Sequence, residues 1–177
     1  RCLPNNTREI LHATWDTPVA SRVPFGVIKS WSFVGADYAL FEKINPDFKS
    51  NPFIRNSRFS TAIPYIYADL FNLYGTEVPA GHEICISGYE SHVKCGSVTS
   101  SDSRAKLKSF RPGSNRDLFY HMIVASIKGP LSDMDRGGTV FSVETGDNLH
   151  LIVHGILTAF RYFGSQDTSI ITMYINR

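Results

Sequence analysis

The sequence predicts an all-β fold with two lobes. Short runs rich in Val, Ile, Phe and Tyr recur along the chain and are interrupted by Gly, Pro, Asn or Ser, which is the spacing of an antiparallel sandwich or barrel. With 177 residues and 42% hydrophobic content, the chain can bury one substantial core or two small ones packed together. We therefore expect a folded, β-rich globular protein.

The expected strands follow one another with turns between them. The first two contain Phe25 to Trp31 and Tyr38 to Ile44, with turns at Gly35 and at Asn45-Pro46. The later runs cover residues 53–59, 63–67, 83–87, 92–99, 118–126, 139–143 and 149–159. Nine strands of this length and spacing are typical of β-barrels and β-sandwiches.

Two segments depart from this pattern. Near the end, Ile170, Ile171, Tyr174 and Ile175 fall on one face of an expected short C-terminal helix. Residues 100–117 are polar, basic and rich in turn-forming residues, so we expect a long exposed loop there.

Charge and hydropathy argue against two classes of partner. The net charge is only +2, and charged residues make up 19% of the chain, so a nucleic-acid partner is not indicated. The apolar run "HLIVHGILTAF" is shorter than the roughly 20 residues that span a bilayer and is interrupted by His154 and Gly155. We expect no membrane partner, no cofactor and a monomer.

The three cysteines favour one disulfide and one cysteine without a partner in the chain. Cys85 and Cys95 lie ten residues apart, on either side of a Gly-containing turn. Cross-strand cysteines at that separation can meet the Cα spacing of about 5.5 Å that a disulfide requires. Cys2 then remains without a partner in the chain.

Two further kinds of site can be tested on the sequence, a zinc site near these cysteines and a glycosylation site at the start of the chain. His82 and His92 lack a fourth ligand at a sensible spacing, so zinc is disfavoured and we expect no metal. Asn5-Asn6-Thr7 is a glycosylation sequon at Asn5, which adds slight weight to secretion.

The cysteine segment resembles a known family. Ile84-Cys85-Ile86-Ser87-Gly88 through Lys94-Cys95-Gly96 is similar to the second-barrel hairpin of trypsin-like serine proteases of the bacterial α-lytic and streptogrisin type and their fungal relatives. Upstream, "GADYALFEKI" resembles the family's Asp-aromatic-Ala-Leu strand. Downstream, "MDRGGTVFSV" aligns with Gly-Asp-Ser-Gly-Gly-Pro-Val-Phe, and "LHLIVHGILTA" is similar to the apolar strand ending in Gly-Ile-Val-Ser. The matches occur in the family's order and span most of the chain.

This resemblance implies a fold of two antiparallel β-barrels with an active site in the cleft between them. Residues 1–68 would form the remainder of an incomplete N-terminal barrel and the crossover. Residues 69–177 would form the C-terminal barrel with the terminal helix. In such enzymes an imidazole removes the serine proton, a carboxylate holds the imidazole, and backbone N–H groups stabilise the oxyanion.

At the serine position the sequence departs from the family. Arg136 stands there, and a permanently charged guanidinium cannot act as a nucleophile near neutral pH. In the oxyanion loop, Asp135 and Gly137 are retained. Met134 replaces the family's Gly, and its side chain would narrow or distort the oxyanion hole.

The resemblance assigns the other two triad positions to Asp37 and Arg1. Asp37 would orient the catalytic imidazole, although taken alone it is better explained as a strand-end Asp in a turn. The family's His precedes a Cys about thirty-five residues before that Asp, which puts Arg1 at or next to the His position and the partner of Cys2 upstream.

Substitutes for the missing groups were also weighed. His12, Ser132 and Ser142 could each be proposed, but a triad works only when heavy atoms come within roughly 3 Å in a defined geometry. We expect none of them to be used. His150 and His154, on alternating positions beside the elbow, are expected to be hydrogen-bonded or solvated.

The resemblance further implies that Thr158, Ala159 and Phe160 form the strand and pocket against which a substrate peptide would lie. Plain barrel packing explains Phe160 equally well.

Three hypotheses follow. The leading one is a secreted trypsin-like serine protease homologue that has lost catalysis and binds peptides or proteins. The second is an active serine endopeptidase whose His lies upstream of this fragment. The third is an extracellular β-rich interaction domain whose likeness to proteases is only structural.

Overall fold

The structure is a computed structural model, and it describes residues 9–12, 21–32, 38–55, 65–69, 78–108, 116–144, 150–163 and 167–174. The chain divides into two compact units, Arg1–Asn51 and Pro52–Arg177. In the described ranges the regular structure consists of β-strands and short 3-10 turns, without α-helices. The predicted all-β class is confirmed. Across these same ranges, no helix has the length and apolarity needed to traverse a bilayer.

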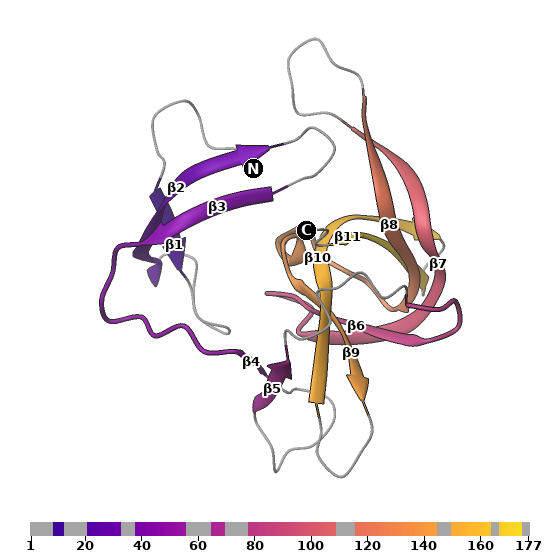
Figure 1. The fold of residues 1–177 in the computed structure, drawn as a ribbon, viewed down its shortest axis with the longest axis horizontal. Coiled ribbons are helices and arrows are strands. Elements are labelled where there is room, and N and C mark those ends of the chain that lie inside the picture. Colours follow the sequence, from indigo (N-terminus) through magenta and orange to yellow (C-terminus); the bar gives the residue numbers. More distant parts are fainter. Residues whose placement is uncertain are drawn as a thin grey trace. The chain divides into compact units, whose positions relative to one another are not determined.

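The first unit contains a three-stranded antiparallel sheet. Its strands are β1 (Glu9–His12), β2 (Val23–Ser32) and β3 (Tyr38–Lys43), in the order β1-β2-β3 (Figure 1). The sequence had indicated β2 and β3 but not β1, which is too short to show an alternating pattern.

Aromatic rings pack together within this first unit. Phe25 on β2 lies 5.5 Å from Phe41 and 5.2 Å from Phe48, measured between ring centroids. The ring of His12 is edge-on to Phe48 at 4.7 Å. These contacts give His12 a packing role in the first unit.

The second unit is built on a ring of six antiparallel strands. They are β6 (Glu83–Ser87), β7 (Val93–Lys108), β8 (Arg116–Lys128), β9 (Thr139–Glu144), β10 (His150–Phe163) and β11 (Asp167–Tyr174). The sheet order is β11-β8-β7-β6-β9-β10, and β10 also pairs with β11, which closes the ring (Figure 1). A closed sheet of this kind leaves few exposed strand edges.

Two further strands extend the second unit. β4 (Phe53–Arg55) pairs antiparallel with β5 (Tyr65–Asp69), and β5 runs parallel to the start of β10. Both strands therefore belong with the second unit. The assignment of residues 1–68 to an N-terminal barrel and crossover stays a prediction.

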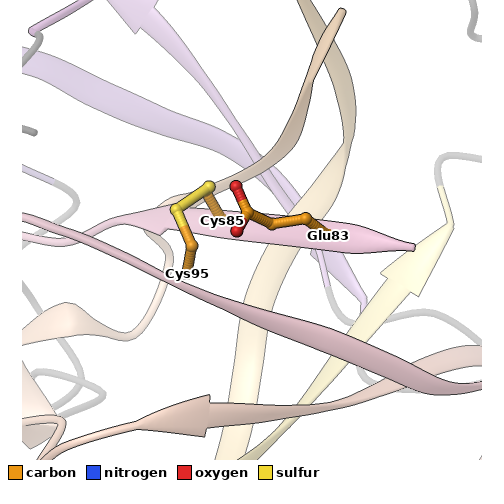
Figure 2. A group of neighbouring side chains, drawn as sticks. All are labelled: Glu83, Cys85 and Cys95. Carbon is orange, nitrogen blue, oxygen red and sulfur yellow. A yellow bond between two sulfur atoms is a disulfide. The ribbon is translucent and has the colours of Figure 1, made fainter. Parts of the chain in front are cut away.

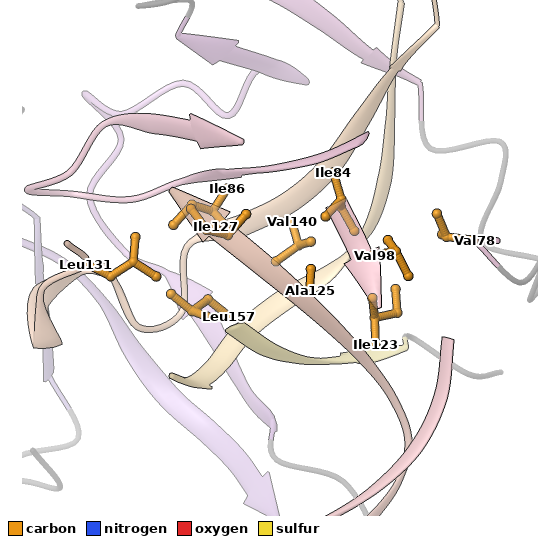
Figure 3. Packing of buried hydrophobic residues seen from close by; sticks show 10 residues of the cluster. All are labelled: Val78, Ile84, Ile86, Val98, Ile123, Ala125, Ile127, Leu131, Val140 and Leu157. Atoms are coloured by element: carbon orange, nitrogen blue, oxygen red, sulfur yellow. The ribbon is translucent and has the colours of Figure 1, made fainter. Parts of the chain in front are cut away.

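Two hydrophobic clusters use opposite faces of the same strands. Ile84 and Ile86 of β6 and Val140 of β9 belong to the first cluster, together with residues of β7, β8 and β10 (Figure 3). Cys85 and Phe141, which alternate with them, belong to a second cluster that includes Ile54 of β4. Successive side chains of a strand point to opposite faces. β6 and β9 are therefore buried on both sides and make a rigid support for the segments attached to them.

The predicted C-terminal helix is wrong, because residues 167–174 form strand β11. Ile170 pairs with Ala125 of β8 on one side and with Phe160 of β10 on the other. Backbone hydrogen bonding along both edges outweighs the helical spacing of the apolar residues. The β-branched residues of "TSIIT" also favour a strand.

The predicted loop at residues 100–117 is wrong at residues 100–108 and 116–117, which are strand, while residues 109–115 lie outside the described residues. β7 continues to Lys108 and β8 begins at Arg116, which is its partner across the ribbon. A two-stranded ribbon is held by main-chain hydrogen bonds, so its side chains need not be apolar. Asp102 and Arg104 of this ribbon are exposed, which explains why the sequence looked like a loop.

Candidate active site

The elbow, residues 132–138, connects the end of β8 to the start of β9. Its first turn is the 3-10 helix Asp133–Asp135, capped by Ser132. The Ser132 hydroxyl accepts a hydrogen bond from the Met134 amide at 3.2 Å, and Asp135 Oδ2 accepts one from the Ser132 amide at 2.7 Å. This reciprocal capping fixes the turn from both ends.

Asp135 anchors the elbow to the β6–β7 hairpin. Its side chain is fully buried, and its Oδ1 accepts hydrogen bonds from the amides of Glu90 at 2.8 Å and Ser91 at 2.9 Å. Burial raises the pKa of Asp135, but hydrogen bonds from Ser91, Ser132 and Glu90 together outweigh it and hold the pKa below its ordinary value. Asp135 is thus a buried carboxylate kept charged by N–H groups.

Two glycines leave room for this arrangement. A Cβ on Gly88 would lie 2.3 Å from Asp135 Oδ1, and a Cβ on Gly138 would lie 2.5 Å from the Ser87 carbonyl oxygen. Gly137 has a φ of +84°, in the left-handed region that favours glycine. The Gly-Gly of the elbow and the Gly of the hairpin are therefore required by backbone geometry.

The elbow is also hydrogen-bonded to β10. The Gly137 amide donates to the Leu157 carbonyl at 2.8 Å, and the Leu157 amide donates to the Gly138 carbonyl at 2.8 Å. This pair of bonds places Arg136 beside the part of β10 that contains residues 158–160. The resemblance assigns these two segments to one site, and they are adjacent in the structure.

The Arg136 side chain contacts Asp133 and Phe160 among the residues that the structure describes. Its Nη2 lies 3.0 Å from Asp133 Oδ1, and its guanidinium carbon lies 5.4 Å from the centroid of the Phe160 ring. The Arg136 side chain is 41% exposed. The position therefore presents a fixed cation, held by an ion pair and a cation–π contact, and no hydroxyl.

The remaining residues predicted around the elbow differ in exposure. Met134 is 45% exposed, while Thr158, Ala159 and Phe160 are half-buried. The Thr158 hydroxyl is buried, and no hydrogen-bond partner for it occurs among the described residues. Three other predicted site residues, Arg1, Asn5 and Asp37, lie outside the described residues, as does Cys2.

The substitute serines have partners away from any nucleophile position at the elbow. Ser132 caps the 3-10 helix, and its hydroxyl also donates to the Glu90 carboxylate. Ser142 on β9 lies with its Oγ 2.8 Å from His154 Nε2 on β10. Burial lowers the pKa of His154 to about 4, so the imidazole is neutral at physiological pH.

The Ser142–His154 pair was not predicted. His154 stands at a β-bulge, between the paired positions Val153 and Gly155 of β10. A bulge re-aims one side chain relative to the regular alternation. The contact depends on the register that sets Ile152 opposite Ser142, which cannot be read from the sequence, although Gly155 next to His154 is the usual sequence signal of a bulge.

One group of potential metal ligands lies on the β6–β7 hairpin. One donor atom from each of Glu83, Cys85 and Cys95 lies within 4.8 Å of the other two, and Figure 2 shows the Glu83 carboxylate beside the sulfur atoms. The two sulfurs form the predicted disulfide, across directly opposed residues with a Cα separation of 3.9 Å. Cysteine binds metals as a thiolate, and disulfide-bonded sulfurs are not thiolates. We therefore interpret this group as a structural disulfide with a neighbouring carboxylate and not as a metal centre.

Comparisons with known proteins show which solved structures have a similar fold. No protein-family model matches the chain, and no curated protein matches it. Solved structures do match. Cellulomonas bogoriensis chymotrypsin is 16% identical with a TM-score of 0.56, and the match covers 93% of this chain and 75% of that one.

Two further solved structures agree. Thermobifida fusca protease A is 15% identical with a TM-score of 0.56, covering 93% of this chain and 74% of that one. A Nocardiopsis protease is 16% identical with a TM-score of 0.58, covering 85% and 68%. Together with the closed barrel and the elbow at the start of β9, these matches identify the fold of the chain as that of the chymotrypsin-like serine proteases.

Proposed function

We propose that this protein is a catalytically inactive serine protease homologue that binds peptides or proteins. The observation that carries the proposal is Arg136 in the elbow, at the position where the resemblance expects the nucleophilic serine. A guanidinium has no nucleophilic atom at neutral pH, because it stays protonated. Its contacts with Asp133 and Phe160 hold it in that place.

The frame around this position supports a binding function. The capped turn, the buried Asp135 and the hydrogen bonds to Leu157 hold the elbow rigidly without any reactive group. Residues 155–163 of β10 pair with β11 along one edge, and on the other edge β9, among the described strands, reaches only Ile156. A peptide that adds as a strand could pair just beyond that point, at Thr158 and Ala159.

A direct test of inactivity uses the purified protein with chromogenic peptide substrates and a fluorophosphonate probe. We expect no turnover and no labelled serine, with a bacterial chymotrypsin-like protease as the positive control. Stoichiometric labelling of any serine would contradict the proposal, and peptide mapping would then identify the nucleophile.

The second candidate is an active serine endopeptidase, and the Ser142–His154 hydrogen bond is the observation that favours it. A neutral imidazole beside a hydroxyl can accept its proton. Against it, the lowered pKa of His154 makes the imidazole a weak base. Ser142→Ala separates the two functions: it should abolish any fluorophosphonate labelling if this pair is reactive, and change nothing if the protein is inactive.

We further propose that the protein is secreted and acts as a monomer. The Cys85–Cys95 disulfide supports an oxidising compartment, where such bonds form and persist.

A further inference from the structure

We propose that Arg136 binds a carboxylate of the peptide ligand, so that the site selects acidic peptides. This inference rests on the proposed peptide-binding function and specifies the ligand of that same site. It starts from the observation that the residue in the serine position is a fixed and accessible cation.

The backbone next to Arg136 and two side chains restrain the position of its guanidinium. The backbone next to it is fixed by the hydrogen bonds between Gly137, Gly138 and Leu157. Its side chain lies over the Phe160 ring, which itself packs against the first hydrophobic cluster. Asp133 contacts one terminal nitrogen. A cation fixed in this way loses little conformational entropy when it binds a ligand.

Donors remain available on this guanidinium. The Phe160 ring has no oxygen or nitrogen acceptor, so this contact is made with the charge of the guanidinium. Asp133 is paired with Nη2, and the side chain is 41% exposed. Arginine carries five N–H donors in a fork that matches a carboxylate.

Nearby acidic groups oppose an acidic ligand to different degrees. The charge of Asp135 is buried and compensated by three backbone amides. Glu90 accepts a hydrogen bond from Ser132. Asp133 is 82% exposed, and an exposed ion pair between residues three apart is weak, so a ligand carboxylate can share or replace it. Asp133 is thus a competitor that tunes the affinity.

The test uses calorimetric titration with three peptides of one length: acetyl-Ala-Ala-Pro-Glu-amide, acetyl-Ala-Ala-Pro-Gln-amide, and acetyl-Ala-Ala-Pro-Gln with a free C-terminal carboxylate. We expect at least one carboxylate peptide to bind about tenfold more tightly than the neutral amide. The two charged peptides distinguish a side-chain carboxylate from a chain terminus. The preference should fall as salt is raised.

Variants of the elbow test whether Arg136 causes the preference for carboxylate peptides. Arg136→Met should remove it, and Arg136→Lys should retain only part, because an ammonium lacks the fork. Asp133→Asn should strengthen binding of the charged peptide a few-fold by removing the competitor. Arg104→Met, at an exposed position of β7, makes the same charge change and should leave the preference intact.

The outcomes separate this inference from the function on which it rests. Equal binding of all three peptides, or a preference retained in Arg136→Met, would overturn the carboxylate site while leaving peptide binding in place. Absence of binding by all three peptides overturns both for this ligand class. Circular dichroism of each variant confirms that any loss reflects the site and not the fold.

Discussion

The elbow contains two regions that differ in how completely the fold determines them. The frame, defined as Asp135, Gly88, Gly137 and Gly138, is fixed by burial, by hydrogen bonds to three backbone amides and by glycines that a Cβ or an L side chain would disturb. The reactive position, Arg136, is partly exposed, and its contacts with other described residues are an exposed ion pair and one ring contact.

This difference indicates that the residues of the frame and the residue at the reactive position have separate roles. The frame accommodates a long cation at the reactive position, because the Arg136 side chain is 41% exposed. Stability should therefore depend on the frame, and ligand recognition on Arg136.

The largest expected effect is on the frame, from Asp135→Ala. Loss of the buried carboxylate leaves three partly buried backbone N–H groups without their acceptor, which should lower the free energy of unfolding by about 3 kcal/mol. Urea denaturation measures it, with the exposed Asp133→Ala as the matched control, expected within about 0.5 kcal/mol of the parent. A similar decrease in the free energy of unfolding in both variants would contradict the distinction between the two regions.

A second buried titratable group, His154, should make stability depend on pH. Burial lowers its pKa from 6.5 to about 4, so between these values the unfolded chain takes up a proton that the native protein does not. Stability is then greatest above about pH 6.5 and falls, by up to about 3 kcal/mol, as the pH is lowered to about 4. Asp135 behaves differently, since its lowered pKa keeps its contribution until the pH falls below 3.8.

The measurement is urea unfolding at several pH values between 4 and 7, with His154→Gln as the control. Glutamine can still hydrogen-bond Ser142 but does not titrate, so its profile should be flatter than the parent's in this window. An unchanged profile in the variant would show that other groups cause the dependence.

The smallest expected effect on stability is at the reactive position, from Arg136→Ala. Because the Asp133 pair is exposed, its loss together with the Phe160 contact should cost about 1 kcal/mol or less. Thermal unfolding followed by circular dichroism checks this. A loss as large as that of Asp135→Ala would mean that Arg136 belongs to the frame.

Much of this fold could be predicted because its strands alternate clearly. β6 and β9 appeared at nearly their observed limits, and the Cys85–Cys95 bond followed from two cysteines flanking a turn. The errors arose where pairing decided the outcome. β11 has helical spacing but is held between β8 and β10, and residues 100–104 of β7 are polar in sequence although they belong to a strand paired with β8.

The sequence by itself determined the all-β class, the hairpin disulfide and the presence of an arginine in a Gly-Gly elbow, because alternation, cysteine spacing and residue identity are local properties. Only the tertiary structure decided that Asp135 is anchored by amides some 45 residues away, that the bulge at His154 meets Ser142, and that Arg136 lies over Phe160. Each of these contacts joins different segments, which the pairing of β9 with β6 and with β10 brings together.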